Sequence, residues 1–383
     1  MKFKIENPPQ REIVIFDGTS LNDLKYILHK KKFFVLENRK SRISTVYCSL
    51  NIIITFFFNF FLLFFKNKNL HTIYLFTLLE KINPKIVITS IDNSFKFAEL
   101  AKLLSKKIKF AAIQNANRFD YMHNIYLFKK NLSVSNLNNK YFIPHFFCFG
   151  EHEINQIKKY KINIDQVYKV GSIRVANFFK HIELNKIKLQ KEKYDVCLIS
   201  EAAPNINEKF EIKDLEEKFA KVAKFTIDYS KKYNLKFIFL QKRNLNSIEN
   251  KEEMNFYKKY LNKNDFNFLK KNSSLNQNNY SSYLGLFQSK LAVGAQSTLL
   301  RDKIGCKEKI LSLGLDNEGL FEFPINGICK LKNLDYLEFE NRMNLILSLN
   351  SEDYFAKIEE PINNLIEFDE NFSTIDKIIA KLF

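Results

Sequence analysis

The segment Lys290–Leu313 reads KLAVGAQSTLLRDKIGCKEKILSL and indicates the fold of the whole chain. It begins with a short apolar run that ends at Gly294, continues through a polar turn and a helical pattern, and closes on a second apolar run. This order of strand, turn, helix and strand is typical of a βαβ unit. Because the turn before such a helix exposes backbone N–H groups at the positive end of the helix dipole, it predicts a site for an anion, a phosphate above all.

The polar residues of this turn, Gln296–Thr298, have two explanations. Their hydroxyl groups suit a phosphate, but Ser and Thr are also preferred as ordinary helix caps. Other polar residues follow predicted strands in the same half of the chain. Glu201 comes after YDVCLIS, and the basic pair Lys242 and Arg243 comes after KFIFL. The basic pair suits a phosphate, but it suits an exposed turn equally well. The candidate nucleotide-binding residues are Glu201, Lys242, Arg243, Gly294, Gln296, Ser297 and Thr298.

Basic residues dominate the charge of the chain. Its 383 residues include 60 Lys and Arg against 42 Asp and Glu, giving a net charge of +18, with basic clusters such as Lys30–Lys32 and Lys106–Lys109 spread along the chain. No arginine-rich arm, zinc-finger spacing or RNA-binding aromatic motif accompanies this charge, so we expect no nucleic-acid partner. Anionic lipid headgroups and phosphorylated substrates suit diffuse basicity better.

Cysteine usage and the N-terminus both indicate the cytoplasm. The five cysteines are scattered without a CxxC pair, as expected for reduced thiols. The N-terminal stretch MKFKIENPPQREIVIFDG has no apolar signal core before its polar residues, so we expect no secretion signal. The predicted location is cytoplasmic, with peripheral contact at the inner face of the membrane as an option.

The most apolar segment is Cys48–Phe65, CSLNIIITFFFNFFLLFF, and it leaves three structures open. It is about long enough to span a bilayer. However, Asn51, Thr55 and Asn59 recur every four residues as a narrow polar stripe, which also suits a helix wedged inside a domain or lying on a membrane surface. A span would split a sheet, because predicted strands lie on both sides of the segment.

Strand and helix patterns alternate along both halves of the chain, as in an α/β protein of Rossmann type. In the first half, a helix is predicted at Ser20–Leu28, with Ser20 and Asp23 as a capping box. The pattern restarts after the lysine-rich segment Phe178–Lys193 and includes a short strand at Asn267–Leu269. We therefore predict an N-terminal Rossmann-like domain at 1–180, a C-terminal one at 190–370 and a C-terminal helix at 371–383.

In the N-terminal half, polar clusters follow several predicted strands, at the sheet edge where open α/β sheets bind ligands. Ile91–Ser94 follows KIVITS, and Gln114–Arg118 follows KFAAI. A third cluster, Gly171–Arg174, begins at the last residue of QVYKVG. Glu151 follows the strand YFIPHFFCFG, and the histidines near it lack the HExxH spacing of a zinc site. We therefore expect a ligand site without a metal at this edge.

Together these motifs resemble a known family. The turn in the second half has the form G-x-x-S-T-L-x-R-(D/E)-x-x-G, which is similar to the donor-phosphate turn of GT-B glycosyltransferases. With the three N-terminal clusters it forms an ordered set that resembles the bacterial surface-carbohydrate biosynthesis family related to retaining β-Kdo transferases. Ala116 departs from the family pattern, where Gly is expected, and Asp302 stands where Glu is more common. The implied fold class is α/β, GT-B-like, with two Rossmann-type domains and a C-terminal helical tail.

The resemblance implies transfer of Kdo or a related ulosonic acid from a CMP-activated donor to a surface glycan or lipid-linked acceptor, without a metal or other cofactor. Such transfer develops an oxocarbenium-like centre, and a carboxylate that attacks first gives retention of configuration. Asp92 is the predicted nucleophile and Glu151 a candidate general base, although a helix cap and a surface charge would explain them as well. The candidate substrate-binding residues are Asn93, Ser94, Gln114, Asn115, Arg118, Ser172 and Arg174.

Three classes of function stay open at this point. The first is the sugar transferase. The second is another GT-B-shaped enzyme, either a UDP-sugar 2-epimerase or a polyol-phosphate transferase, the latter usually with catalytic histidines for which His145 alone is weak support. The third is a non-catalytic scaffold that binds a membrane assembly complex, although such a scaffold has no need to retain polar residues at several strand ends.

Overall fold

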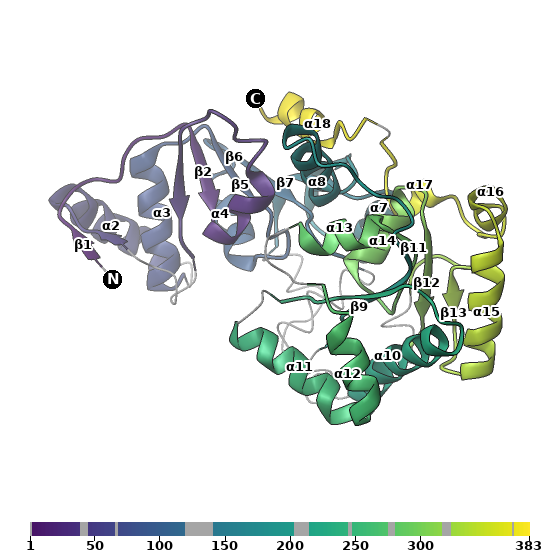
Figure 1. The fold of residues 1–383 in the computed structure, drawn as a ribbon. Helices are drawn as coiled ribbons and strands as arrows, with labels where there is room; N and C mark the ends of the chain where they lie inside the picture. The colour runs from purple at the N-terminus through teal and green to yellow at the C-terminus, as the bar shows by residue number, and fades with distance from the viewer. Residues whose placement is uncertain are drawn as a thin grey trace.

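The computed structural model describes residues 2–38, 45–65, 68–118, 141–202, 214–243, 247–274, 280–315, 323–369 and 371–383. Within these ranges the chain folds into two large parallel sheets, each covered by helices, that lie side by side (Figure 1). A small additional sheet pairs β1 (Lys2–Lys4) with β4 (Thr45–Tyr47). The α/β class predicted from the alternating patterns is confirmed.

The first sheet has the strand order β3-β2-β5-β6-β7-β8, and every neighbouring pair is parallel. Its central strands β2 and β5 are buried along their whole length, as expected for a parallel sheet with helices on both faces. Along β2, Val14 and Phe16 enter one core cluster, whereas Ile13 and Ile15 enter the other. The strands are β2 (Ile13–Phe16), β3 (Phe33–Leu36), β5 (Ile86–Thr89), β6 (Lys109–Ile113), β7 (Ile143–Cys148) and β8 (Ile164–Lys169). The helices around this sheet include α3 (Leu70–Ile82), α4 (Phe95–Leu104), α7 (Glu151–Tyr160) and α8 (Ile173–Leu184).

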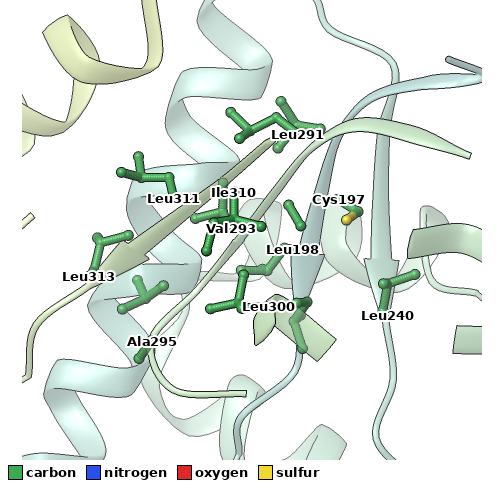
Figure 2. Packing of buried hydrophobic residues seen from close by; sticks show 14 of the residues in the cluster. Cys197, Leu198, Leu240, Leu291, Val293, Ala295, Leu300, Ile310, Leu311 and Leu313 are labelled. Atoms are coloured by element: carbon green, nitrogen blue, oxygen red, sulfur yellow. The ribbon is translucent and has the colours of Figure 1, made fainter. Parts of the chain in front are cut away.

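The second sheet has the order β10-β9-β11-β12-β13 and is also parallel throughout. The predicted βαβ unit is confirmed as β11, helix α14 and β12. Figure 2 shows its core, where Val293 of β11 lies among Leu311 and Leu313 of β12, Leu198 of β9 and Leu300 of α14. The strands are β9 (Tyr194–Ile199), β10 (Phe237–Leu240), β11 (Ser289–Gly294), β12 (Lys309–Leu313) and β13 (Lys330–Leu331). The helices include α10 (Leu215–Lys232), α11 (Ile248–Tyr260), α12 (Lys263–Lys271), α13 (Ser281–Phe287), α14 (Thr298–Gly305) and α15 (Tyr336–Ser348).

Two local predictions are wrong. The expected strand Asn267–Leu269 is part of helix α12. The expected helix Ser20–Leu28 is reduced to a 3-10 turn, η1 (Gly18–Ser20), and a single helical turn, α1 (Leu21–Leu24), and the predicted cap makes no side-chain hydrogen bond to the helix. The segment 178–193, where we predicted the domain boundary, begins inside helix α8 and ends directly before β9 of the second sheet.

The apolar segment Cys48–Phe65 forms helix α2 (Leu50–Phe64). Asn59 on its polar stripe faces the protein, whereas many apolar side chains on the opposite side are exposed, so the interpretation as a buried helix is wrong. Asn59 points inward because it meets polar partners on α3, where it donates to Thr77 and Glu80, whereas Asn51 at the start of the stripe is exposed. Among the helices that the structure describes, none has both the length and the apolar character needed to cross a bilayer.

The C-terminal segment runs from the second domain back to the first. After α16 (Ser351–Phe355) and α17 (Ile362–Leu365), helix α18 (Thr374–Leu382) lies beside α8 in Figure 1. Ile378 is fully buried in the same core cluster as Ile15 and Ile88 of the first sheet. The C-terminal helix therefore completes the hydrophobic core of the N-terminal half.

Candidate active site

Polar side chains at the carboxyl ends of three strands of the first sheet converge on Asp23. Asp23 follows β2, and its Oδ2 accepts hydrogen bonds from Ser90 Oγ after β5 (2.8 Å) and Asn115 Nδ2 after β6 (3.2 Å). Its Oδ1 accepts from Nε of Arg174 (3.1 Å), in the first turn of α8. Strands β2, β5 and β6 are neighbours in the sheet, so their ends bring these residues together. Asn115 and Arg174, both predicted from the sequence, therefore meet at one carboxylate.

Asp23 was missed as a site residue because its spacing from Ser20 fits a capping box. In the structure, Ser20 Oγ instead accepts from the backbone N–H of Ser90 (3.0 Å), which leaves Asp23 to face Asn115 and Arg174. The sequence signal that could have identified Asp23 is its position after β2, the first strand of this sheet in chain order. The rule that selected the residues after β5 and β6 applies to β2 as well.

The Asp23 cluster borders a cavity of about 200 Å³ that both domains line. Asp23, Arg174 and Asn177 line it from the first domain, and Tyr280 and Tyr283, at the start of α13, from the second. Asn177 donates to the backbone oxygen of Asp23 (2.8 Å), while its own Oδ1 has no hydrogen-bond partner among the described residues. A buried acceptor without a partner at a cavity can take a hydrogen bond from a ligand hydroxyl group.

Behind the second-domain wall of this cavity lies a buried carboxylate, Asp302 of helix α14. Burial raises the pKa of Asp302 to about 6, although hydrogen bonding and nearby arginines oppose the shift. The hydroxyl of Tyr283 donates to Asp302 Oδ2 (2.6 Å), and this bond holds the ring of Tyr283 at the cavity.

The predicted nucleophile, Asp92, is held by Arg118. Arg118 donates from Nε to Asp92 Oδ2 (3.0 Å) and from Nη2 to Oδ1 (2.7 Å), and Asp92 is fully buried. Burial raises the pKa of Asp92, and the guanidinium of Arg118 opposes that shift. Both predicted residues are therefore brought together, but as a closed ion pair. The next two residues after Asp92 are Asn93 and Ser94, and both are partly exposed. Ser94 caps α4 by accepting from the N–H of Phe97 (3.3 Å).

Glu153 supplies a buried carboxylate at the domain contact, two residues after Glu151, the candidate general base. Glu151 is partly exposed in the first turn of α7 and pairs with Lys169 (3.1 Å). Glu153 is buried and accepts from Arg301 of the second domain and from Nε2 of Gln114 (3.0 Å). Gln114, predicted to bind substrate, is fully buried in this contact.

The turn between β11 and α14 already holds an anionic group from its own chain. The carboxylate of Glu201 accepts from the backbone N–H groups of Ala295 and Gln296, the latter at 2.7 Å. A side chain at Gly294 would meet Glu201 Oε2 at 3.0 Å, so glycine lets the carboxylate come close. The predicted phosphate donors are therefore occupied by Glu201 in this structure. Ser297 caps α14 through the N–H of Leu299 (3.2 Å).

The same turn contacts the first domain through Asn117. The hydroxyl of Thr298 accepts from the backbone N–H of Asn117 (3.1 Å), and Asn117 Nδ2 donates to the carbonyl of Gln296 (2.9 Å). The structure thus brings two predicted motifs, the clusters after β6 and β11, into direct contact across the domains. This contact was not predicted, because nothing in the local sequence reports which turns face each other.

The remaining predicted residues lie at the edges of these clusters. The backbone N–H groups of Lys242 and Arg243 donate to the carboxylate of Glu253 (2.8 and 3.0 Å), and their side chains are exposed after β10. Ser172 caps α8 through the N–H of Val175 (3.4 Å). In the described ranges, no group of three or more His, Cys, Asp or Glu side chains is arranged to hold a metal ion.

No protein-family model and no curated protein matches this sequence. Solved structures do match. One is UDP-N-acetylglucosamine 2-epimerase from Methanocaldococcus jannaschii, in complex with UDP-GlcNAc and UDP, at a TM-score of 0.54 and 13% identity over 97% of this chain and 98% of that one. Another is a variant of the wall teichoic acid polymerase TagF, at a TM-score of 0.53 and 9% identity over 97% and 88%. The chain has the two-domain GT-B-type fold.

Proposed function

We propose that this protein is a glycosyltransferase that uses a nucleotide-activated sugar and carries out the transfer in the cavity around Asp23. The observation that carries the proposal is the convergence of Ser90, Asn115 and Arg174 on that carboxylate, beside a cavity that both domains line. A ligand site at the carboxyl edge of a parallel sheet, facing a second domain, is the usual position in open α/β folds.

Each polar group of the cavity has a role in such a transfer. Asp23 supplies negative charge where an oxocarbenium-like centre develops. Attack by its carboxylate on the anomeric carbon breaks the bond to the donor's nucleotide, which leaves. The acceptor hydroxyl then displaces the carboxylate and releases its proton to water, so the configuration is retained. Arg174 keeps 40% of its side chain exposed, so its guanidinium can bind a carboxylate or phosphate of the donor while Nε holds Asp23. The free oxygen of Asn177 accepts from a sugar hydroxyl.

The donor proposed is a CMP-activated ulosonic acid, and the acceptor a surface glycan or lipid-linked glycan. The support is the ordered set of sequence motifs, together with a cationic Arg174 that matches the carboxylate of such a sugar. The role first considered for Asp92 passes to Asp23. A nucleophile must reach the substrate, and Asp23 lines the cavity between the domains, whereas Asp92 has no exposed surface and forms an ion pair with Arg118.

The test is Asp23→Asn, assayed for transfer with a panel of CMP-, UDP- and CDP-sugars. The amide keeps the size of the side chain but loses its charge, so transfer should fall at least about a thousandfold, on the order of 4 kcal/mol of barrier, while the fold and nucleotide binding persist. Asp165→Asn, at an exposed position in the same domain, is the matched control and should leave the rate unchanged. Near-normal transfer by a folded Asp23→Asn protein would remove Asp23 from the reaction.

A second candidate is a UDP-sugar 2-epimerase, favoured by the end-to-end similarity to the Methanocaldococcus enzyme. Thermal stabilisation separates the two, because a ligand at about a hundred times its Kd adds about 2.7 kcal/mol to stability. CMP should stabilise the protein more than UDP does. Stabilisation by UDP, with formation of the 2-epimer from UDP-GlcNAc in the absence of any acceptor, would assign the protein to the epimerases instead.

A further inference from the structure

Helix α2 buries the polar side chain of Asn59 but exposes most of its apolar side chains. Asn59 is 2% exposed and donates to Thr77 Oγ1 (3.1 Å) and Glu80 Oε2 (2.7 Å) of α3. The solvent side is apolar, with spacings of three and four residues that place its members on one face. Its main members, each between 53% and 83% exposed, are Ile54, Phe57, Phe58, Phe61, Leu62 and Phe65.

The exposed face belongs to a well-anchored helix. Ser49 caps its first turn through the N–H of Ile52 (3.2 Å), and Ile52 and Leu63 are buried beneath it. Strand β1 is tied to the helix start by the bond from Cys48 N–H to the carbonyl of Lys4 (2.9 Å). A contiguous apolar face of this kind on a fixed helix marks an interaction site, since water-facing surfaces of soluble domains rarely carry one.

Positive charge is concentrated in the same domain. Residues 1–180 contain 29 Lys and Arg against 12 Asp and Glu, whereas residues 181–383 contain 31 against 30. Next to the helix start, Lys81 Nζ donates to Asn51 (2.8 Å), and Lys2 is exposed on β1. The side chains of Phe3 and Ile5, 68% and 86% exposed, add apolar surface at this end. Apolar side chains combined with strong basicity match an anionic lipid surface.

We propose that helix α2 and strand β1 dock this protein on an anionic bilayer, with α2 lying in the plane of the membrane interface. With 15 residues the helix is about 22 Å long, too short for a hydrocarbon core of about 30 Å. A second copy as the occupant would bring two strongly basic domains together, which like-charge repulsion opposes. In Figure 1, α2 and β1 lie at the end of the first domain away from the second.

The experiment is sedimentation of the full chain with vesicles of phosphatidylcholine alone or of two parts phosphatidylcholine to one part phosphatidylglycerol. The protein should bind the anionic vesicles preferentially, and salt should weaken binding because it screens charge within about 10 Å at 0.1 M. Phe58→Ser with Phe61→Ser should lower partitioning at least about tenfold, because both rings leave the interface. Far-UV circular dichroism should be unchanged, because both replaced side chains are mostly exposed.

The matched control replaces two equally exposed apolar residues of the second domain, Ile248→Ser with Leu337→Ser, at 73% and 66% exposure. This variant should bind vesicles like the parent protein. Absence of binding, binding that ignores lipid charge, or equal binding of the Phe58 and Phe61 variant would overturn the proposal. So would a lipid-free dimer, seen by analytical ultracentrifugation, that the Phe58 and Phe61 variant dissociates. These readouts need no enzymatic activity and are independent of the proposed sugar transfer.

Discussion

Glu153 and Arg301 form a fully buried, bidentate ion pair that joins the two domains. Arg301 Nη1 and Nη2 each lie 2.7 Å from a carboxylate oxygen of Glu153, and both side chains have no exposed surface. Arg301 also donates from Nε to the carbonyl of Leu365 (3.0 Å), so the pair reaches the C-terminal segment as well. Burial opposes the charge on Glu153, but attraction to Arg301 outweighs it and lowers the pKa of Glu153.

Replacing Glu153 with glutamine should destabilise the protein by about 3–5 kcal/mol, because Arg301 would keep a buried charge without its partner. Urea unfolding followed by far-UV circular dichroism measures the change, since the chain has no tryptophan. The pKa of Glu153 is lowered on folding, so its contribution is present above the ordinary glutamate range and is lost as the pH falls through the lowered pKa. The deficit of the variant should therefore shrink in acid.

The control for this prediction is Glu183→Gln. Glu183 pairs with Lys180 (2.9 Å) at an exposed site of α8 and is also part of the first domain. Exposed pairs contribute little, so this change should stay within about 0.5 kcal/mol. An equal loss in the two variants would contradict a special role for the buried pair.

The fold was predictable from the sequence because its elements are marked locally. Helices α3 and α4, for example, each begin after a residue type that commonly caps helices, Asn69 and Ser94 respectively. The strand at Asn267–Leu269 failed because a few apolar residues carry no period that separates strand from helix. Short segments therefore depend on packing that local patterns do not report.

The site was predictable only in part, because its residues meet through contacts distant in sequence. Asn115 and Arg174 were selected from their strand ends, but Asp23, which both contact, looked like a local cap. Glu151 was selected because it follows a strand, but residues two apart on a helix point to nearly opposite sides, and it is Glu153 that faces the second domain. Which of them faces Arg301 depends on how α7 is rotated against the second domain.

Asp302→Asn should stabilise the protein more at pH 7 than at pH 4. Burial raises the pKa of Asp302 to about 6, so the folded state holds its proton more tightly than the unfolded chain does. Stability from this group is therefore greatest in acid and declines as the pH rises through about 6, by up to about 3 kcal/mol. Asparagine cannot ionise and still accepts from Tyr283. Parallel pH profiles of unfolding free energy for the variant and the parent would contradict this.

Glu201→Gln should cost about 1–3 kcal/mol, because the amide group can accept only one of the two backbone N–H bonds from Ala295 and Gln296. Burial raises the pKa of Glu201, and these bonds oppose the shift. Urea unfolding measures the loss, and Glu217→Gln, at an exposed position in α10, should show almost none. Calorimetry with CMP should also show tighter binding to Glu201→Ala if the donor phosphate uses these N–H groups, since the competing carboxylate is removed.

Gly171→Ala should lower both stability and transfer. Gly171 has a φ of +83°, where a side chain is strained, and a Cβ there would lie 2.8 Å from the carbonyl oxygen of Glu367. The strain should cost about 1–3 kcal/mol and displace the start of α8, which carries Arg174 to within 3.1 Å of Asp23. The matched change Gly18→Ala has no positive φ, and its Cβ meets only the movable end of the Glu37 side chain, so it should cost about 0.5 kcal/mol or less. The midpoint of urea unfolding and the transfer rate should both fall for Gly171→Ala, and neither should fall for Gly18→Ala.

A Gly171→Ala variant with a normal unfolding midpoint and a normal rate would contradict this prediction. It would show that the start of α8 tolerates movement, so that the spacing of Arg174 from Asp23 is not critical.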